Sequence, residues 1–598
     1  MSKNIISIYP GHNANITFYN GTHDSYHVIE VEKLFGIKHC RMESKHYVPY
    51  RDEYVNPIEA IIRALEIAKK HWNIDNDFDV VINGTSCPDR NFFHQQLNPE
   101  VIDYTLNTKS VVNGCPHHVA HMYCAWKQSP FERAYVITVD GGGDDGVFNG
   151  YELHANGTFH KMWHSHANMG RNMNILGAFV KDIADKTGNQ LDIAGKVMGL
   201  SAYGKHRPEL VTEFKRLIND NVMNNEIINT RKDLRSYENN PHYYTKFEFL
   251  KELKKMSPID DKLFYTENYY KRGLIFADKC VNSGHWWTEK GKTDTQPINC
   301  YAVLEGQDGY DWCFNLQKAV EEILLERVNE HYQRIKDHFN NNLLMSGGVV
   351  LNVLVNEAIR REFSDLNTYV PPNPADGGLS FGTLVEYRAR KLGDISRKNI
   401  TYSGPPISDP ENEYYTKHDF VTEKDIADRL KQGQIIGLIQ GGSEVGPRAL
   451  GNRSILCDPS IPGIKDKLNA EVKFREWYRP FAPVCKLEDL EEYFNSTDYK
   501  YLQYMSFALD VKPKYKEILK AVTHVDNTAR VQTVTKGQNK ILYEILQHHG
   551  GVLLNTSFNV QGKPILNTID EAFHILNNTG LDAFVYDGTR GLQLYEVQ

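Results

Sequence analysis

The residues whose types and spacing first suggest chemistry are two histidines one helical turn apart. The segment PHHVAHMYCAW, residues 116–126, places His117 and His121 four positions apart, with His118 between them. Such a pair aims two imidazoles at one side of a helix, which suits a divalent metal. A zinc-peptidase helix needs Glu beside the first histidine as its base, and His118 stands there instead. Hydrolytic zinc chemistry of that type is therefore disfavoured.

Two ligands are too few for a metal site, so carboxylates from elsewhere must complete it. Asp140 follows the apolar run YVITV, and Asp376 lies in PPNPADGGLSFG. Each precedes glycines at an expected element boundary, which makes the two carboxylates the natural candidates. On the histidine pair alone, imidazoles satisfied inside a hydrophobic core are the more common explanation.

A second group of informative residues is basic and lies in the last third of the chain, among aromatic residues and glycines. The segments GGSEVGPRALGNRSIL, AEVKFREWYRPFAPV, HVDNTARVQTV and LLNTSFNVQGKP supply Arg448, Arg453, Lys473, Arg475, Arg479, His524, Arg530, Ser557 and Asn559. If these cations converge they need a counter-anion, and a phosphate held by arginine forks and hydroxyls would provide it. Separate surface ion pairs are the alternative.

The elements that must position these groups follow a repeated pattern. NIISI, a Pro-Gly-His-Asn turn, NITFY, Asn20-Gly21 and SYHVIEVE predict three strands joined by a turn and a hairpin. AYVITV, DGGGDDG, VFNGYEL, Asn156-Gly157 and TFHKMW repeat that order. Each unit has a glycine-bearing turn whose amides could approach a phosphate. The repeat suggests a duplicated, actin-like nucleotide-binding architecture, with two chance meanders as the alternative, and apolar periodicity predicts helices over 57–70 and 314–328.

Two further glycine-containing segments could line a nucleotide cleft. In NNLLMSGGVVLNVLVNEAI a strand leads through Gly347-Gly348 into a helix, a plausible place for close approach of a nucleotide. AGKVMGLSAYGK is a near miss for a phosphate-binding loop, because Val197 follows Lys196 where a magnesium-binding hydroxyl is required. A helix packed through small residues is the alternative for this second segment.

Length and composition bound the remaining expectations. A chain of 598 residues should hold two or three domains. A polar, proline-rich stretch around 400–430 predicts a linker before a final domain. Residues 205–300 interleave basic and aromatic side chains, which could clamp nucleobases or sugars, although a helical insertion with a solvated charged face is the plainer explanation.

Membrane and secretory roles are not expected. No apolar run is long enough to span a bilayer, and the N-terminal apolar stretch is too short for a signal-peptide core. Nine scattered cysteines without a C-x-x-C pair fit reduced thiols, so a cytoplasmic location is expected. The net charge of −8 gives no bulk reason for polyanion binding.

Eight motifs in order carry a resemblance to one family. HHVAH, VDGGG, AGKVMGLSAYG, SGGVVLN, PPNPADGGLSFG, GSEVGPRALG, REWYRPFAP and NTSFN resemble the O-carbamoyltransferases of the NodU/CmcH family, from about residue 4 to the C-terminus. The resemblance implies an α/β protein with a duplicated actin-like (ASKHA) nucleotide-binding domain over 1–400, interrupted by a divergent insertion at about 205–300. A YrdC-like α/β domain over 415–598 follows. The family's EEER run is EVEK here, a departure that ends at Lys33.

The resemblance also implies a reaction and the residues that perform it. Such enzymes form carbamoyl-adenylate from carbamoyl phosphate and ATP, and pass the carbamoyl group to an acceptor hydroxyl. The metal, Fe²⁺ with Mg²⁺ or Mn²⁺ as alternatives, would be held by His117, His121, Asp140 and Asp376. The carbamoyl-phosphate pocket maps onto Arg448, Lys473, Arg479, His524, Arg530 and Ser557, and the catalytic residues onto His12, Arg448 and Lys473. The nucleotide contacts would be Lys38, Gly141, Gly142, Lys196, Gly347, Gly348 and Asn352.

The acceptor is the least determined part of this prediction. Sugars, other small hydroxylated metabolites and a hydroxymethyl-pyrimidine in nucleotide or DNA are all conceivable acceptors, and a homodimer is one expected assembly. Two other functions stay open on the residues alone. One is metal-dependent hydrolysis from the histidine helix, and the other is a non-catalytic nucleic-acid-binding factor that uses residues 205–300.

Overall fold

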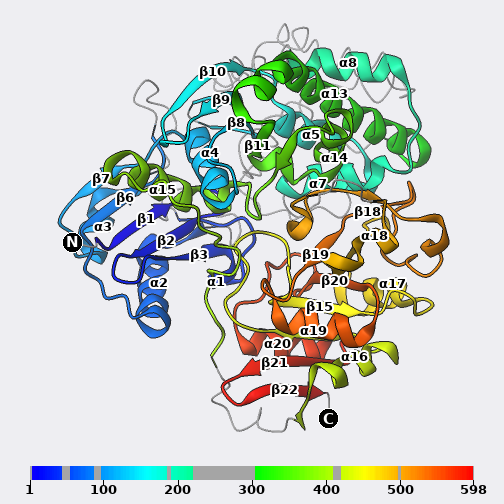
Figure 1. Ribbon diagram of the computed structural model, residues 1–598. Coiled ribbons are helices and arrows are strands. Elements are labelled where there is room, and N and C mark those ends of the chain that lie inside the picture. The colour runs from blue at the N-terminus through cyan, green and yellow to red at the C-terminus, as the bar shows by residue number, and fades with distance from the viewer. Residues whose placement is uncertain are drawn as a thin grey trace, which may run out of the picture.

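The computed structural model describes residues 3–42, 54–86, 96–143, 145–184, 190–219, 304–408, 419–495 and 500–596. Within them the chain forms three large β-sheets and two two-stranded ones, with helices on the faces of the large sheets (Figure 1). The predicted α/β class is therefore confirmed. Most of the predicted insertion, including Tyr269 and Trp286, lies outside the described residues. None of the helices in the described ranges is both long enough and apolar enough to cross a membrane.

The first sheet is built from the N-terminal strand unit and two later strands. Its order is β3-β2-β1-β6-β7, antiparallel through the first three strands and parallel from β1 onward. The strands are β1 (Ile5–Tyr9), β2 (Asn15–Asn20), β3 (Ser25–Glu30), β6 (Val80–Asn83) and β7 (Val111–Asn113). Helix α2 (Pro57–Trp72) packs on one face through the apolar stripe that the sequence predicts over 57–70.

The second sheet repeats this arrangement strand for strand. Its order is β10-β9-β8-β11-β12, again with three antiparallel strands followed by two parallel ones. The strands are β8 (Ala134–Val139), β9 (Phe148–Leu153), β10 (Phe159–Ser165), β11 (Asn342–Ser346) and β12 (Asn367–Tyr369). The repeated strand pattern in the sequence is thus a repeat of topology.

Two helices lie between the first and second sheets. Helices α4 (His117–Gln128) and α15 (Leu379–Leu392) pack against each other and share one apolar cluster with strands of both sheets. This sandwiched position explains why every residue of α4 is buried, charged and polar ones included. Long helix α13 (Gly306–Phe339), which contains the predicted helix 314–328, packs beside the second sheet with α5 (Met169–Gly177), α7 (Ile193–Ser201), α8 (Pro208–Asn219) and α14 (Val353–Glu362).

The third sheet belongs to the C-terminal part. Its order is β13-β22-β21-β14-β15-β20-β16-β19. The strands are β13 (Asp419–Phe420), β14 (Ile436–Ile439), β15 (Arg453–Cys457), β16 (Ala482–Lys486), β19 (Gln532–Val534), β20 (Leu553–Ser557), β21 (Ala583–Gly588) and β22 (Gly591–Glu596). Helices α16 (Glu423–Lys431) and α19 (Lys540–His549) cover one face, and α20 (Ile569–Asn578) covers the other. The predicted linker at 400–430 is therefore too long, since β13 and α16 begin within it.

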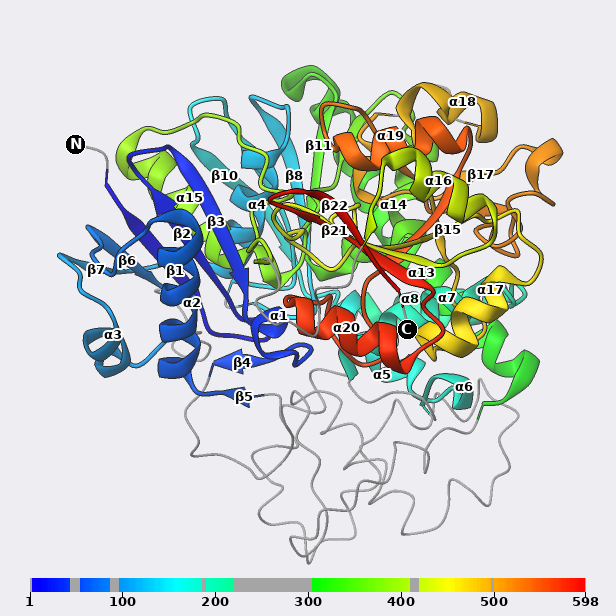
Figure 2. The same cartoon turned by 90° about the horizontal axis from the view of Figure 1, so that it is seen from below.

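The C-terminal part packs directly on the two earlier sheets. One apolar cluster continues from the second sheet into the third, and includes Tyr135 and Phe481. Figure 2 shows α1 (Val31–Phe35) beside α20, where Lys563 Nζ donates a hydrogen bond of 3.3 Å to Gly36 O. The C-terminal part therefore contacts both the first strand unit and the second sheet.

Candidate metal centre and anion pocket

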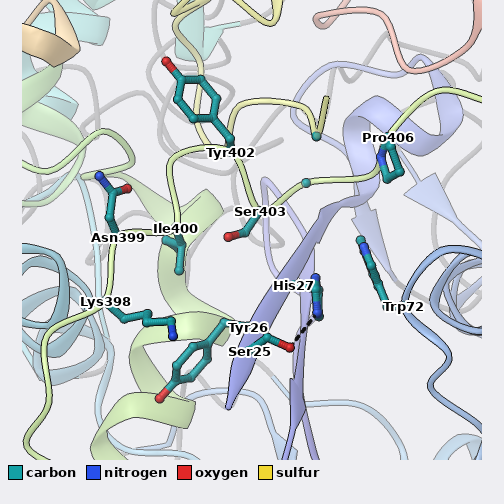
Figure 3. Close-up of a pocket in the computed structure, with 12 residues that line it drawn as sticks. Ser25, Tyr26, His27, Trp72, Lys398, Asn399, Ile400, Tyr402, Ser403 and Pro406 are labelled. Atoms are coloured by element: carbon teal, nitrogen blue, oxygen red, sulfur yellow. Dashed lines mark hydrogen bonds between the residues drawn. The ribbon is translucent and has the colours of Figure 1, made fainter. Parts of the chain in front are cut away.

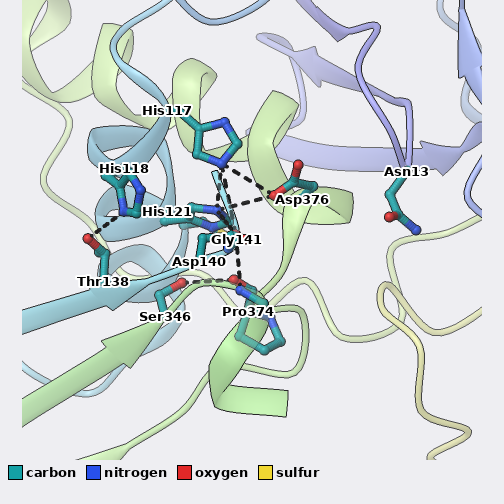
Figure 4. A network of polar contacts seen from close by, with 12 residues as sticks. Asn13, His117, His118, His121, Thr138, Asp140, Gly141, Ser346, Pro374 and Asp376 are labelled. Atoms are coloured by element: carbon teal, nitrogen blue, oxygen red, sulfur yellow. Dashed lines mark hydrogen bonds and ion pairs between the residues drawn. The ribbon is translucent and has the colours of Figure 1, made fainter. Parts of the chain in front are cut away.

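Four side chains that are distant in sequence converge between the first two sheets. Figure 4 shows His117 and His121 on α4, Asp140 after β8 and Asp376 at the start of a 3₁₀ turn (Asp376–Gly378), pointing toward a common point. All four residues are buried, and one ligand atom from each lies within 4.8 Å of the others. The structure thus brings together the complete set that the sequence predicts.

The distances within this cluster fit a cation better than a set of ordinary hydrogen bonds. The two histidine Nε2 atoms are 3.2 Å apart, and Asp376 Oδ1 lies 3.4 Å and 3.3 Å from the Nε2 atoms of His117 and His121. Asp140 Oδ2 lies 3.9 Å and 3.0 Å from the same two nitrogens. Ligands about 2.1 Å from one cation are separated by about 3.0–3.4 Å in octahedral or tetrahedral geometry. The donor set therefore fits a divalent metal.

Electrostatics keep both carboxylates ionised. Burial acts to raise the pKa of Asp376, but His12 and His117 outweigh it and hold this pKa well below its usual range. The pKa of Asp140 is likewise lowered, because the two ligand histidines outweigh burial and the neighbouring Asp376. Two negative charges in a buried site are what a divalent cation would neutralise.

His118 has an ordinary structural role. Its Nδ1 lies 2.9 Å from Thr138 Oγ1 and its Nε2 lies 2.9 Å from Gly146 O. Burial lowers its pKa to about 4, so the ring is neutral, with Nε2–H donating to the carbonyl. His118 is therefore not one of the candidate metal ligands.

The predicted glycine turns position Asp140. Its Oδ1 accepts a 2.5 Å hydrogen bond from Gly141 N, and its Oδ2 accepts one of 3.0 Å from Gly348 N. Gly347 has φ +101°, and a Cβ there would lie 2.1 Å from Val139 O, so only glycine fits. In the structure, Gly141 and Gly348 therefore hold a ligand carboxylate, and their contact with a nucleotide stays a prediction.

Asp376 is oriented by two residues of the first strand unit. Its Oδ2 accepts a hydrogen bond of 2.8 Å from Tyr9 Oη and lies 3.1 Å from His12 Nε2. Its Oδ1 is thereby left facing the ligand histidines. The sequence singles out His12 but not Tyr9, although Tyr9 ends β1 just before the Pro-Gly-His turn.

Three other predicted nucleotide contacts have protein partners. Lys38 forms an ion pair with Asp192, and Lys196 lies within α7 rather than in a loop, with its Nζ 2.6 Å from Glu476 Oε1. Asn352 caps α14 and donates a 2.7 Å hydrogen bond to Gln317 Oε1. Both Lys196 and Asn352 are buried, and their side chains bind neighbouring protein groups in this structure.

A cluster of arginines forms the second candidate site. Arg448, Arg475, Arg479 and Arg530 are each half-buried, on loops that surround the third sheet. Burial and the like charges of the other three arginines lower the pKa of Arg530 well below its usual range, and burial with Arg479 lowers that of Arg448 to about 10. No carboxylate among the described residues forms an ion pair with Arg448 or Arg530. Arg479 Nη1 lies 3.4 Å from Glu476 Oε2, but Glu476 also pairs with Lys196, so the cluster keeps an excess of positive charge that a bound anion would neutralise.

His524 and Lys465 border the arginine cluster. Burial and the charges of Arg530 and Lys465 lower the pKa of His524 to about 4, and its buried Nε2 has no hydrogen-bond partner among the described residues. His524 therefore offers a neutral ring nitrogen beside the cations. The sequence singles out His524 but not Lys465, whose short helix (Ile464–Lys467) carries no recognisable signal.

Lys473 and Ser557 meet at the end of β20. The buried Lys473 Nζ donates hydrogen bonds to Ser557 O at 2.7 Å and to Asn559 O and Oδ1, each at 2.6 Å. Its ammonium group is thus fixed by the protein, and its contact with a substrate stays a prediction. Arg453, by contrast, is fully buried and donates to four backbone carbonyls, which makes it structural.

One short 3₁₀ helix, Gly348–Leu351, connects the arginine cluster with the metal ligands. Arg448 Nη2 donates a 3.1 Å hydrogen bond to Leu351 O. Leu351 ends the 3₁₀ helix that begins at Gly348, whose N–H holds Asp140. The arginine cluster and the metal ligands therefore contact opposite ends of the same short helix.

A separate pocket of about 310 Å³ lies between β3 and the segment 398–406 (Figure 3). His27 stacks on Trp72 with ring centroids 4.4 Å apart, and its Nε2 lies 2.9 Å from Ser25 Oγ. None of the predicted site residues lines this pocket, so it is distinct from both sites above.

Comparison with known proteins identifies the family. The family model described as Carbamoyltransferase N-terminus matches residues 76–385, and that described as Carbamoyltransferase C-terminus matches residues 427–590. The chain is 27% identical to nodulation protein NolNO of Sinorhizobium fredii, across 93% of this chain and 75% of that one. It is 31% identical to the 3'-hydroxymethylcephem-O-carbamoyltransferase of Amycolatopsis lactamdurans, across 46% and 53% of the two chains.

Among solved structures, full-length HypF in its phosphate- and nucleotide-bound form aligns with 66% of this chain and 48% of its own length. The TM-score is 0.32 at 12% identity, which is too low to support an inference. The two family models, which together match most of the chain, do support one. The chain belongs to the NodU/CmcH carbamoyltransferase family and is a carbamoyltransferase.

Proposed function

We propose that this carbamoyltransferase forms carbamoyl-adenylate from carbamoyl phosphate and ATP, and transfers the carbamoyl group to an acceptor hydroxyl. The observation that carries the proposal is the arginine cluster, because Arg448 and Arg530 have no carboxylate partner among the described residues and Arg479 shares Glu476 with Lys196, an excess of positive charge that calls for a phosphate-bearing substrate. Its link to the metal ligands through Leu351 supports an assignment of two consecutive steps to two neighbouring sites.

The first step belongs to the arginine cluster. Water cleaves carbamoyl phosphate into carbamate and phosphate, and a carbamate oxygen then attacks the α-phosphorus of ATP and displaces pyrophosphate. Arg448, Arg479 and Arg530 would neutralise the dianion and stabilise the departing phosphate. Lys473, Ser557 and His524 would complete the pocket.

The second step belongs to the metal centre. The acceptor oxygen attacks the carbamoyl carbon, and AMP leaves with the electron pair of the broken bond. His12 is our candidate base: its Nε2 is directed at Asp376, and its Nδ1, which lies 3.2 Å from Asn13 Oδ1, would exchange that contact for the acceptor hydroxyl to take the proton. A divalent cation held by the four buried ligands would polarise phosphate or carbonyl oxygens. Two imidazoles favour Fe²⁺ over Mg²⁺ or Mn²⁺, which prefer all-oxygen sites.

The domain assignment is part of this proposal. The shared strand order of the first two sheets supports a duplicated actin-like (ASKHA) domain over residues 1–400. Residues 415–598 would form the YrdC-like domain, and the family-model matches divide the chain in the same region. ATP would contact Lys38 and the turn at Gly141-Gly142, where a Cβ on Gly142 would meet no atom of the described residues within 4 Å.

Release of pyrophosphate tests the proposal. We expect the full chain, incubated with carbamoyl phosphate, ATP and Fe²⁺, Mn²⁺ or Mg²⁺, to release pyrophosphate, and the Arg530→Ala variant to lose this activity. Mass spectrometry across a panel of sugars, small alcohols and hydroxymethyl-pyrimidine nucleotides and DNA should then detect one carbamoyl increment on the true acceptor class. No pyrophosphate with any metal would overturn the proposed reaction.

A further inference from the structure

A buried ion pair lies between the metal ligands and the arginine cluster, and no step of the reaction above uses it. Glu30 ends β3 and Lys33 lies in the following helix α1. The two side chains form an ion pair and are 8% and 4% exposed, respectively. Burying two charges is unfavourable unless other polar groups satisfy them, so the surroundings of this pair show what it does.

Both charges are satisfied by one loop of the C-terminal part. Lys33 Nζ donates hydrogen bonds to Glu444 O at 2.7 Å and to Gly446 O at 3.0 Å. Glu30 Oε2 accepts a hydrogen bond of 3.1 Å from Gly446 N. The pair therefore holds donor and acceptor groups of the loop 444–448, which ends at Arg448.

The same pair also contacts the loop that carries a metal ligand. A Cβ on Gly377, the residue after Asp376, would lie 3.0 Å from Glu30 Oε1. Gly446 has φ +123°, and a Cβ there would lie 2.6 Å from Pro372 O. Gly446 thus lies directly against loop 372–377, and the Glu30 carboxylate contacts both Gly377 and Gly446.

The geometry points to Glu30 and Lys33 as positioning residues that hold the Arg448 loop at a fixed place beside the metal-ligand loop. Arg448 is held at its far end by Leu351 O, so the loop is fixed on both sides. Without the pair, the loop backbone loses three polar contacts, two at Gly446 and one at Glu444, and Arg448 is no longer placed for its anion. This inference rests on the proposed function, because it assumes that the arginine cluster binds phosphate.

Binding of inorganic phosphate and of Mn²⁺ to the full chain, each measured by calorimetry, tests this inference. We expect Lys33→Met to weaken phosphate binding about tenfold or more while Mn²⁺ affinity is unchanged, and Lys33→Arg to restore most of the loss. Lys127→Met is the matched control, since Lys127 is also buried and pairs with Asp394 at 2.8 Å, away from the loop. It should leave phosphate binding unchanged.

Two further variants separate the ways in which the inference can fail. Arg448→Ala should abolish phosphate binding, and if it does not, the proposed anion pocket itself is wrong. If Arg448→Ala weakens phosphate binding but Lys33→Met does not, the positioning role is overturned and the pocket stands. The double variant Glu30→Gln/Lys33→Met removes both charges and keeps the packing, so normal phosphate binding by this folded protein would also overturn the role.

Discussion

At the scale of single residues, Asp376 connects most of the chemistry. One of its oxygens faces the two ligand histidines, and the other accepts from Tyr9 and lies beside His12. Hydrogen bonds to the outer oxygen of a ligand carboxylate fix its orientation and tune its affinity for the metal. The base proposed for the acceptor and the metal ligand are thus oriented together.

Tyr9→Phe should weaken metal binding without unfolding the protein. The variant removes only the hydroxyl that donates to Asp376 Oδ2, and we expect a loss of about 10- to 100-fold in Mn²⁺ affinity, measured by calorimetry. Tyr19→Phe removes a hydroxyl that donates to Asp24 at 2.9 Å and should leave the affinity unchanged. Equal Mn²⁺ affinity in both variants would contradict a positioning role for Tyr9.

His27 should make stability depend on pH. Burial lowers the pKa of His27 to about 4 from its ordinary 6.5. The unfolded chain therefore binds a proton at His27 more readily than the folded chain does. The free energy of unfolding accordingly falls as the pH drops from 6.5 toward 4, and the contribution of His27 to stability is complete above pH 6.5.

The variant His27→Phe checks this dependence. It keeps the stack on Trp72 and cannot be protonated, so its melting temperature should fall less between pH 7 and pH 5 than that of the unmodified protein. His160→Phe, at an exposed position of β10, should reproduce the unmodified decline. The same decline in all three proteins would count against the pH effect of His27.

At the scale of elements, the sites depend on where strands end. Asp140 follows β8, Gly347-Gly348 follows β11, and the two strands are parallel neighbours, so their ends meet at one edge of the sheet. Helix α4 presents its histidine pair to that edge because it is sandwiched between the sheets. The turn after β11 therefore helps to position the Asp140 carboxylate for the metal site.

Gly347→Ala should damage the metal centre through the backbone. The new Cβ would lie 2.1 Å from Val139 O, so the strand ends that place Asp140 must separate. We expect a loss of about 2 kcal/mol or more in the free energy of unfolding, measured with urea. Gly195→Ala in α7, where nothing lies within 4 Å, should be neutral or stabilising by up to about 1 kcal/mol. Similar destabilisation by both would refute the close-approach argument.

Much of this arrangement can be predicted from local sequence, and the remainder depends on distant partners. The histidine pair, the repeated strand order and the glycine turns are local patterns with fixed periods, and the structure contains them. Tyr9 and Lys33 could not be found in this way, because their partners Asp376 and Gly446 lie hundreds of residues away. At Lys196 the structure forms a helix, the alternative to a nucleotide-lining loop, and the ion pair with the distant Glu476 could not be seen from the local pattern.

At the scale of the whole molecule, two neighbouring sites are expected to perform two separable steps. The arginine cluster belongs to the C-terminal part, and the other site is formed by the four metal ligands, which all lie before residue 400, together with Tyr9 and His12 of the first strand unit. The 3₁₀ helix Gly348–Leu351 and the Glu30–Lys33 pair connect them. A substitution that disrupts one site should therefore leave the reaction step at the other site intact.

The most direct test is the effect of His121→Ala on the two steps measured in the same protein. The variant removes one metal ligand and leaves every contact of the arginine cluster in place. We expect it to bind inorganic phosphate with unchanged affinity and to release pyrophosphate from ATP and carbamoyl phosphate, while carbamoyl transfer to the acceptor is abolished. Loss of phosphate binding together with transfer, in a variant that remains folded, would contradict the two-site account.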